Sequence, residues 1–403
     1  MLKKLLVLIV TAFVDMVGLL MVIPLMPYYA RDLGAGSMMV TVLVVSFTAA
    51  QLLSAPLWGR FSDKYGRRPA LLVGLGAAAI AYVVFAYASS IWLLLLSRIV
   101  QGAGGGTVGV IQAYVADSTE PDNRAKALGW LSAATNLGVA LGPPLGSVAL
   151  LMGHTGPGVV AAGLCLVNMA FAWKYLRESR DMEDAKTSVQ KRGASRAAIA
   201  RVITHAKEPG PRLIWIYAIA MGSFSAVTAI LPLFLADQFG IGEKKVWIFF
   251  TYIGTISVIT RAGFLGTAVE KFGEARLSRI GLVMLAAGLA SYPFVHNYVL
   301  LAVAVALVPL GTAFTFPCVT SLLSRVIPSS ERGLYMGVQQ TYGGLSRIVI
   351  PLWAGFSYDH FGRHVPFITS AVLVLGTLLL GLGVTDGRAT SRIAETTTSG
   401  RSS

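Results

Sequence analysis

Long apolar runs recur along the whole chain and are separated by short polar connectors. Each run is long enough to cross a hydrocarbon core of ~30 Å as a helix of roughly 20 residues. The pattern therefore predicts membrane-spanning helices throughout. The predicted spans are residues 5–29, 40–58, 70–88, 91–115, 127–151, 157–176, 213–236, 246–266, 277–295, 298–323, 333–356 and 365–385.

Composition supports this interpretation. Of the 403 residues, 55% are hydrophobic and 13% charged, and the mean hydropathy is +0.68. A soluble protein of this length would be more polar. No small-residue cleavage site follows the first run, so we expect it to be a retained helix rather than a signal peptide.

The longest polar connector, residues 177–212, divides the spans into two groups of six. It is basic, and a short surface helix is expected near 195–206. We therefore predict an all-α polytopic membrane protein whose twelve transmembrane helices form two pseudo-symmetric six-helix bundles. The predicted domains are an N-terminal bundle (1–176), a cytoplasmic basic linker (177–212), a C-terminal bundle (213–385) and a disordered cytoplasmic tail (386–403).

An internal repeat supports the two bundles. The segment "GRFSDKYG" at 59–66 has a counterpart, "GTAVEKFG", at 266–273, and the prolines Pro121 and Pro328 have the same separation. Duplicated halves around a central pathway are typical of secondary transporters.

The formal net charge is +14, but the basic residues concentrate in connectors on one side of the predicted helices. The opposite connectors hold only Arg31, Lys244, Lys245 and Arg363. The positive-inside rule then places both termini in the cytoplasm, and we expect the inner (cell) membrane of a bacterium. No basic face interleaved with aromatic residues is present, so nucleic-acid binding is not expected.

Three motifs resemble those of the major facilitator superfamily. "GRFSDKYGRRP" (59–69) is similar to the signature between helices 2 and 3, "LLLSRIVQGAGGG" (94–106) to that of helix 4, and "GVALGPPLGS" (138–147) to the helix 5 antiporter signature. The opening of helix 1 is similar to that of the twelve-helix drug:proton antiporters, including tetracycline exporters. The matching residues of the first and third motifs are Gly59, Asp63, Gly66, Arg67, Arg68, Gly138, Gly142, Pro143 and Gly146.

The resemblance implies roles for two of these motifs. Asp63 and the neighbouring arginines would bridge the two halves on the cytoplasmic side as a gate, although the cations also serve as topology anchors. In helix 5 the glycines recur every four residues, so they lie close to one face and let a neighbouring helix approach. That smooth face suits either a gate or static packing.

Asp15 and Arg98 lie deep within the first and fourth spans, where a charge costs roughly 2.5 to 3.5 kcal/mol. At 1.5 Å rise per residue their depths are compatible. We hypothesise that they pair in one state and that Asp15 is protonated in another. A static buried ion pair is the alternative.

Two more arginines lie in spans. Arg261 is close to the cytoplasmic end of its span and is expected to extend to the surface. Arg347 is expected to have a structural or gating role, with binding of an anionic substrate group as the alternative. Because the spans contain more arginines than acids, we predict that neutral or anionic amphiphiles are handled better than quaternary ammonium compounds.

Enzymatic chemistry is not expected. The "GAGGG" run lies within an apolar span and lacks the Gly-Lys-Ser/Thr of a phosphate-binding loop. The five histidines lack the spacing of a metal site. We therefore predict no catalytic residues, metal or cofactor, and energy from an ion gradient.

The sequence predicts a monomeric secondary transporter in the lipid bilayer that exports a small amphiphilic molecule in exchange for protons by alternating access. One alternative is a lipid or lysolipid exporter of the same fold, and another is a non-transporting membrane sensor or scaffold. The resemblance implies a cavity lined by helices 1, 4, 7 and 10. The candidate residues are Asp15 and Arg98 for proton coupling, and Gln101, Gln112, Thr228, Phe316, Gln339 and Arg347 for the substrate.

Overall fold

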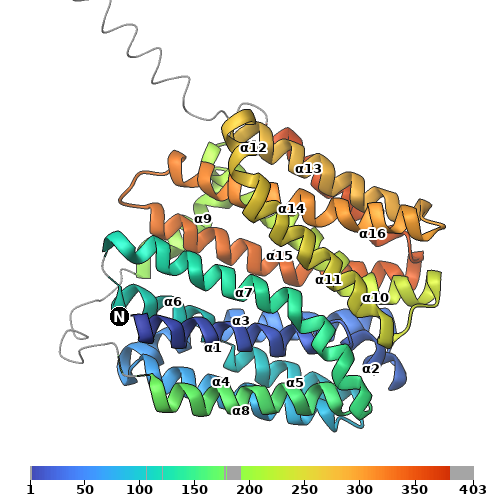
Figure 1. The fold of residues 1–403 in the computed structure, drawn as a ribbon. Coiled ribbons are helices and arrows are strands. Elements are labelled where there is room, and N and C mark those ends of the chain that lie inside the picture. Colours follow the sequence, from blue (N-terminus) through green and yellow to red (C-terminus); the bar gives the residue numbers. More distant parts are fainter. Residues whose placement is uncertain (1, 106, 120, 177, 179–191, 382–403) are drawn as a thin grey trace, which may run out of the picture. The chain divides into compact units, whose positions relative to one another are not determined.

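The computed structural model describes all residues except 1, 106, 120, 177, 179–191 and 382–403. The described residues form helices joined by short turns and contain no strand (Figure 1). The predicted tail lies outside the described residues, as do residues 177 and 179–191 of the predicted linker.

The predicted N-terminal bundle begins with a span that turns at Pro24, so that two helices replace one. Gly66, with φ of +101°, separates the helices of the second and third spans; a side chain would be strained there. The elements are α1 (Leu2–Val22), α2 (Met26–Asp32), α3 (Ser37–Tyr65), α4 (Arg67–Ala86), α5 (Ile91–Gly104), α6 (Thr107–Ser118), α7 (Pro121–Ala149), η1 (Leu150–Met152) and α8 (Gly156–Tyr175).

The remaining helices begin with the surface helix expected in the linker, which is present as α9. The eighth span contains a π-helical turn, η3. The elements are α9 (Arg192–Thr204), α10 (Pro209–Phe239), α11 (Glu243–Ile259), η3 (Thr260–Phe264), α12 (Leu265–Phe272), α13 (Glu274–Ser291), η4 (Tyr292–Phe294), α14 (Tyr298–Val326), α15 (Arg332–Phe361) and α16 (Val365–Leu380).

Ten helical segments of the described chain are long and apolar enough to cross a membrane. The eleventh and twelfth predicted spans correspond to α15, which is 30 residues long but more polar, and to α16, which is apolar but has 16 residues. The predicted fold class is confirmed: the protein is an all-α, multi-pass membrane protein of the two-times-six-helix type.

The chain contacts group the described residues into two compact units. The first contains the chain up to residue 178 together with 226–255 and 351–366, and the second contains 192–225, 256–350 and 367–381. Residues 226–239 of α10, 243–255 of α11 and 351–361 of α15 therefore belong to the first unit. The division of the domains at residues 176 and 213 stays a prediction.

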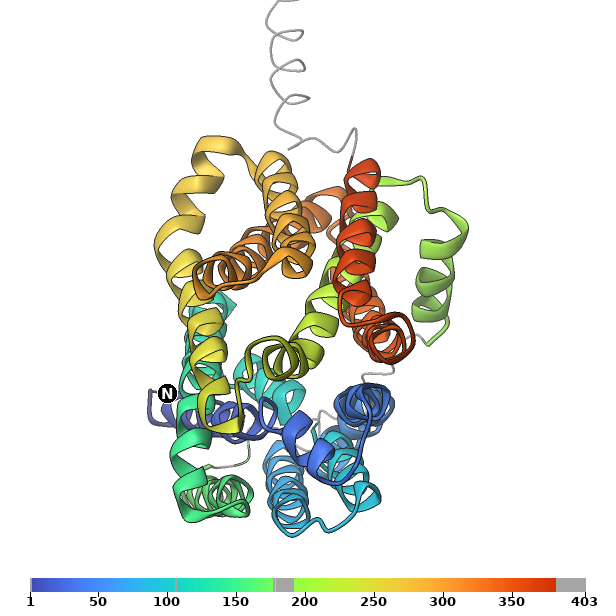
Figure 2. The same cartoon turned by 90° about the vertical axis from the view of Figure 1, so that its right-hand side faces the viewer.

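Within the first unit, α1 packs along α7 on one side and α8 on the other. The neighbours continue from α8 to α4, from α4 to α5 and from α5 to α3. Figure 2 views several of these helices almost along their axes. The helix that carries Asp15 is thus held on two sides.

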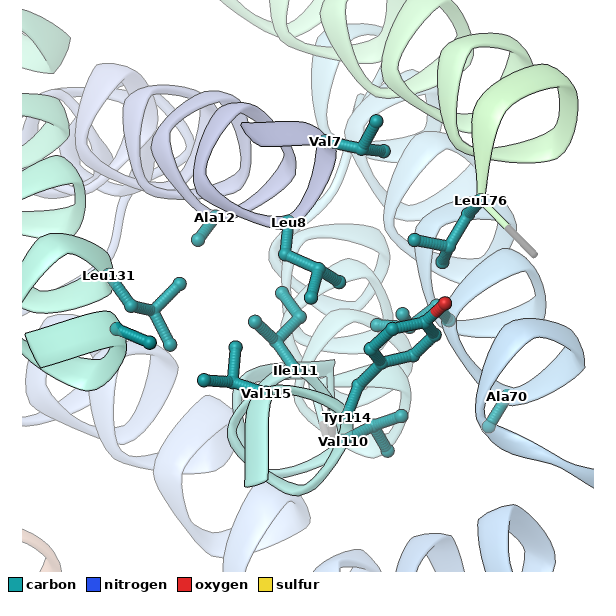
Figure 3. Close-up of a cluster of buried hydrophobic side chains, with 12 residues drawn as sticks. Val7, Leu8, Ala12, Ala70, Val110, Ile111, Tyr114, Val115, Leu131 and Leu176 are labelled. Carbon is teal, nitrogen blue, oxygen red and sulfur yellow. The ribbon is translucent and has the colours of Figure 1, made fainter. Parts of the chain in front are cut away.

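Buried side chains fix one end of this arrangement. Leu8 of α1 points toward Ile111 and Val115 of α6, and Leu131 of α7 completes the contact (Figure 3). Leu8 is 1% exposed, and burying such a side chain contributes about 1.5 to 3 kcal/mol. This cluster holds α6 and α7 against the part of α1 that precedes Asp15.

In the second unit, α13 and α14 pack along each other (Figure 1). A side chain added at Gly311 would lie 2.5 Å from the backbone nitrogen of Leu285, so the two backbones are nearly in contact. Helix α9 is held against the same unit: the indole of Trp215 donates to the carbonyl of Val202 at 3.2 Å, and the hydroxyl of Tyr342 donates to the carbonyl of Ile199 at 2.9 Å.

Candidate functional site

Asp15 faces a small cavity inside the first unit. The hydroxyl of Thr107 donates to its carboxylate at 3.2 Å, and Gln51, Tyr82 and Gln101 also line the cavity. These residues come from α1, α3, α4, α5 and α6. The acid predicted to carry the proton therefore shares its cavity with hydroxyl and amide groups, of which Thr107 is hydrogen-bonded to it.

Arg98 is 2% exposed and lies in the same region, on α5. Its guanidinium donates to the side-chain oxygen of Gln101 and lies over the ring of Phe47, 4.8 Å from the centroid. Arg98 and Asp15 form no ion pair in this structure. Tyr82 lines the same cavity as Asp15. The predicted pairing in another state is therefore not tested.

Tyr82 was not among the predicted site residues. A Cβ added at Gly18 would lie 3.3 Å from the Tyr82 hydroxyl, so this hydroxyl lies beside α1, about one turn beyond Asp15. Tyr82 is 2% exposed and is one of several tyrosines in the apolar runs. No spacing rule singled it out, because the contact joins two helices far apart in sequence.

A second cavity, of about 470 Å³, lies next to this site in the first unit. Gln112, a predicted cavity residue, lines it together with Ser132 and Thr135 of α7, and the rest of its wall is apolar. Met16 lines both cavities. A single helix, α1, thus presents the carboxylate to one cavity and apolar side chains to the other.

The fourth span predicted at 91–115 matches a membrane-length segment of the structure, Ile91–Val115, which two helices form rather than one. Helix α5 ends at Gly104 and α6 begins at Thr107. The amide of Gln51 donates to the carbonyl of Gly105 at 2.9 Å, satisfying a backbone group that the helix leaves unpaired. The interruption brings Thr107 to Asp15; glycine-rich interruptions in membrane helices are a known mark of ion and substrate sites.

The helix 5 glycines pack directly against α1. A Cβ at Gly138 would lie 2.8 Å from the carbonyl oxygen of Phe13, one at Gly142 would lie 2.6 Å from the Cβ of Leu20, and one at Gly146 would lie 2.5 Å from the carbonyl oxygen of Met21. Pro143 lies within α7, which continues to Ala149. The partner of this smooth face is therefore the helix that carries Asp15.

The predicted cytoplasmic gate residues form a cluster inside the first unit. Arg67 pairs with Asp63 at 2.9 Å and with Asp117 at 3.0 Å. The carboxylate of Glu178 accepts the backbone N–H groups of Arg67 and Arg68 at 2.9 and 3.0 Å, which caps the first turn of α4.

Asp117 and Glu178 were not predicted, because each stands in a polar connector far along the sequence from the motif. The Arg68 guanidinium donates to the carbonyl of Trp173. Nothing lies within 4 Å of a Cβ built at Gly59, whereas one at Gly66 would lie 2.4 Å from the Glu178 carboxylate. The contacts of Arg67 all lie within the first unit, so the gate that would join the two halves stays a prediction.

The predicted substrate residues divide between the units. Thr228 belongs to the first unit, and Phe316, Gln339 and Arg347 belong to the second. Phe316 lines a cavity of about 600 Å³ in the second unit together with Arg261. Arg261 lines this cavity as a partly exposed residue, and its expected extension to the membrane surface stays a prediction.

Comparison with known proteins gives the same fold. The family model described as "Major Facilitator Superfamily" matches residues 8–351 and 247–400. The tetracycline resistance protein, class B, of Escherichia coli is 26% identical over 87% of this chain and 87% of its own length. Multidrug resistance protein 1 of Bacillus subtilis (strain 168) is 26% identical over 94% of each chain. The crystal structure of the human organic anion transporter MFSD10 superposes with a TM-score of 0.66 at 22% identity, covering 94% of this chain and 99% of that one.

Proposed function

The chain belongs to the Major Facilitator Superfamily, and from this premise we propose that it exports a small amphiphilic compound, neutral or anionic, in exchange for protons. It is a membrane transporter rather than an enzyme. Its tetracycline- and multidrug-resistance relatives favour export of drug-like molecules.

The observation that carries the proposal is the position of α1. Asp15 and Met16 are consecutive residues; Asp15 faces the small cavity, and Met16 also lines the cavity of about 470 Å³. A substrate that displaces α1 from the larger cavity would alter the surroundings of the carboxylate. Proton binding and substrate binding are then coupled through one helix.

Asp15 supplies the proton-binding group. A carboxylate inside the bilayer is costly unless it is paired, and its only hydrogen bond among the described residues comes from Thr107. Arg98 lies nearby without a carboxylate partner. Movement of α1 toward Arg98 would favour the ionised acid, and movement away would favour the protonated one.

The contact between α1 and α7 supports such a movement. Three glycines leave the α7 surface without side chains where it meets α1, so the helices can shift with few side-chain rearrangements. This shift of α1 within the first unit would accompany the rigid-body rocking of repeats that is typical of alternating access. The Asp63, Arg67 and Asp117 cluster would hold the cytoplasmic end of the first unit during this motion.

The test is transport by the purified protein in proteoliposomes with a preset pH gradient, using a panel of neutral, anionic and cationic amphiphiles. Wild-type protein should collapse the gradient when a substrate is added. Asp15→Asn should lose proton-driven transport but retain exchange of labelled against unlabelled substrate, which requires no net proton movement. Asp15→Glu is the matched control and should retain partial coupling.

Proton-driven transport by Asp15→Asn at the wild-type rate would overturn the assignment of the proton site. A labelled lysolipid in the same panel distinguishes lipid export from drug export. A protein that moves no substrate and no protons would instead fit a sensor or scaffold.

A further inference from the structure

The cavity of about 600 Å³ in the second unit is lined in part by Arg261, a cationic residue that the proposed proton mechanism does not use. Tyr217 and Phe316 form part of its wall, with Arg261, Thr320 and Ser324. Its volume is in the range of small-molecule sites, which combine apolar walls with a few polar groups.

Two arginines in this region have no partner for part of their guanidinium groups. The Nε atoms of Arg261 and Arg347 are both buried and form no hydrogen bond within the described chain. Neither side chain forms an ion pair with a described carboxylate. A guanidinium inside a membrane protein is costly without an acceptor, so a bound anion would supply what the protein does not.

Both arginines lie around the same tyrosine. Arg261 lines the cavity together with Tyr217. Arg347 is not a lining residue, and the packing of α15 on Tyr217 places it beside the cavity. The ring of Tyr217 packs on Gly343 of α15, where an added Cβ would lie 2.8 Å from a ring carbon, and Gln340 donates to its hydroxyl at 3.4 Å. Residues 340, 343 and 347 share one face of a helix, so Arg347 lies one turn beyond this contact.

Arg261 lies in the π-helical turn η3. Turns of this kind are rare in proteins as a whole. Those that do occur are often found at functional sites. Gln339 adds a further donor: its side-chain oxygen accepts from Thr320 at 3.4 Å, whereas its Nε2 atom is buried and unpaired within the described chain. Three buried nitrogen donors therefore have no acceptor within the described chain: Nε of Arg261 in η3, and Nε of Arg347 and Nε2 of Gln339 in α15.

The acid adjoining this wall is already neutralised. The carboxylate of Glu274 pairs with Arg325 at 2.6 Å and accepts from the hydroxyl of Ser321 at 2.8 Å. The positive charges of Arg261 and Arg347 are thus not offset by Glu274, and the local charge favours an anion.

Aromatic side chains border the same cavity. The rings of Tyr217 and Phe316 are 5.4 Å apart, and those of Phe224 and Phe316 are 6.5 Å apart. Met221 and Met336 complete the apolar wall. Methionine and aromatic surfaces adapt to planar apolar ligands.

We propose that this cavity binds an amphiphilic aromatic anion, whose charged group is recognised by Arg261 and Arg347 and whose ring lies against Tyr217 and Phe316. The inference rests on the proposed function and specifies the charge of its substrate. It also assigns Arg261 a role in binding. For Arg347 it selects anion binding over the structural or gating role.

Binding of three probes with one ring and different charges tests this inference: naphthalene-2-sulfonate, naphthalene-2-sulfonamide and trimethyl(2-naphthyl)ammonium. Equilibrium dialysis uses the full-length protein in nanodiscs without a pH gradient. The variants are Arg261→Gln, Arg347→Gln and Arg261→Lys, and Arg276→Gln is a matched control because Arg276 is exposed in the same unit. Thermal unfolding verifies that each variant is folded.

We expect wild-type protein to bind the sulfonate at least tenfold more tightly than the sulfonamide. Each glutamine variant should weaken sulfonate binding about tenfold, equivalent to about 1.4 kcal/mol, without changing sulfonamide binding. Arg261→Lys should retain part of the affinity, and Arg276→Gln all of it.

Equal binding of sulfonate and sulfonamide, unchanged binding in both glutamine variants, or no sulfonate binding would overturn the anion site. None of these results depends on proton coupling. Gradient-driven transport of the neutral probe would leave the proposed export function intact while the anion site failed.

Discussion

The guanidinium of Arg31 donates to both carboxylate oxygens of Asp237, at 2.7 and 2.8 Å. The hydroxyl of Tyr358 donates to the same carboxylate at 2.7 Å, so α2, α10 and α15 meet at Asp237. Nearby, Asp359 accepts the backbone N–H groups of Ser37 and Met38 at 3.0 and 2.8 Å. These contacts, all within the first unit, join segments from both predicted halves on the predicted outer side.

We predict that Arg31→Gln and Asp237→Asn each make the outer side more accessible. Both side chains are 32% exposed, so losing the pair should cost about 1 kcal/mol or less of stability. The same loss should change an open-to-closed equilibrium by up to about fivefold. The measurement is labelling of a cysteine introduced at Thr228 by a membrane-impermeant maleimide, in a background without Cys165 and Cys318.

The charge-swapped double variant, Arg31→Asp with Asp237→Arg, should return labelling toward the wild-type rate, because the pair is restored. Lys245→Gln removes an exposed cation from the same side and is the control. If the control raises labelling as much as Asp237→Asn does, net charge rather than this pair determines the effect.

The contact between α1 and α7 gives a second prediction. Gly142→Ala would place a methyl group 2.6 Å from the Cβ of Leu20 and 3.0 Å from the carbonyl oxygen of Val17, so the helices must separate. Overpacking of this kind costs about 1 to 3 kcal/mol. We expect a lower midpoint of thermal unfolding and a several-fold loss of transport.

Gly129→Ala on the same helix is the matched control, because nothing lies within 4 Å of its added Cβ. Alanine is the better helix former by about 1 kcal/mol, so this variant should be as stable as wild type or more stable. A loss of transport in both variants would indicate an effect of helix propensity rather than of the contact with α1.

The cap on α4 gives a third prediction. Glu178→Ala removes the acceptor of two backbone N–H groups, those of Arg67 and Arg68. Losing a side-chain cap costs about 0.5 to 2 kcal/mol. Thermal unfolding of the purified protein should therefore begin at a lower temperature, whereas Lys174→Ala, a change at a nearby exposed residue, should leave the midpoint unchanged. An unchanged midpoint in Glu178→Ala would mean that the cap contributes no measurable stability.

The apolar runs were sufficient to predict the helices, because hydrophobic length is a local property that the bilayer imposes. The predicted range 213–236 corresponds to α10 (Pro209–Phe239), and 298–323 to α14 (Tyr298–Val326). The end of α5 at Gly104 and the π-helical turn at Thr260–Phe264 were not predicted. Both depend on packing against other helices, which hydropathy does not record.

The candidate site shows the same limit. Asp15 could be identified from sequence because an acid is rare in an apolar run, and the helix 5 glycines because of their spacing. Tyr82, Asp117 and Glu178 could not, because each acts through a contact with a residue at least 50 positions away. Such contacts depend on which helices are neighbours.

The attachment of α9 to the second unit gives the last prediction. Tyr342 and Trp215 each donate one hydrogen bond to a carbonyl of α9, and their rings are 5.3 Å apart at 71°. Removing one buried hydrogen bond costs about 1 kcal/mol, so Tyr342→Phe should raise the population of detached α9 about fivefold. Trypsin cleavage after Arg201 should accelerate by the same factor when opening is fast relative to cleavage.

Tyr252→Phe, which changes a tyrosine of α11 in the first unit, is the control and should leave the cleavage rate unchanged. Because Trp215 and Tyr342 touch each other, their effects should not be independent. The acceleration in the double variant, Trp215→Phe with Tyr342→Phe, should therefore differ from the product of the two single effects. If cleavage after Arg201 is equally fast in wild type and in both single variants, these two hydrogen bonds do not hold α9. Attachment would then depend on the buried side chains of Ala198 and Val202, which are 5% and 0% exposed, and Val202→Ala would be the variant that releases the helix.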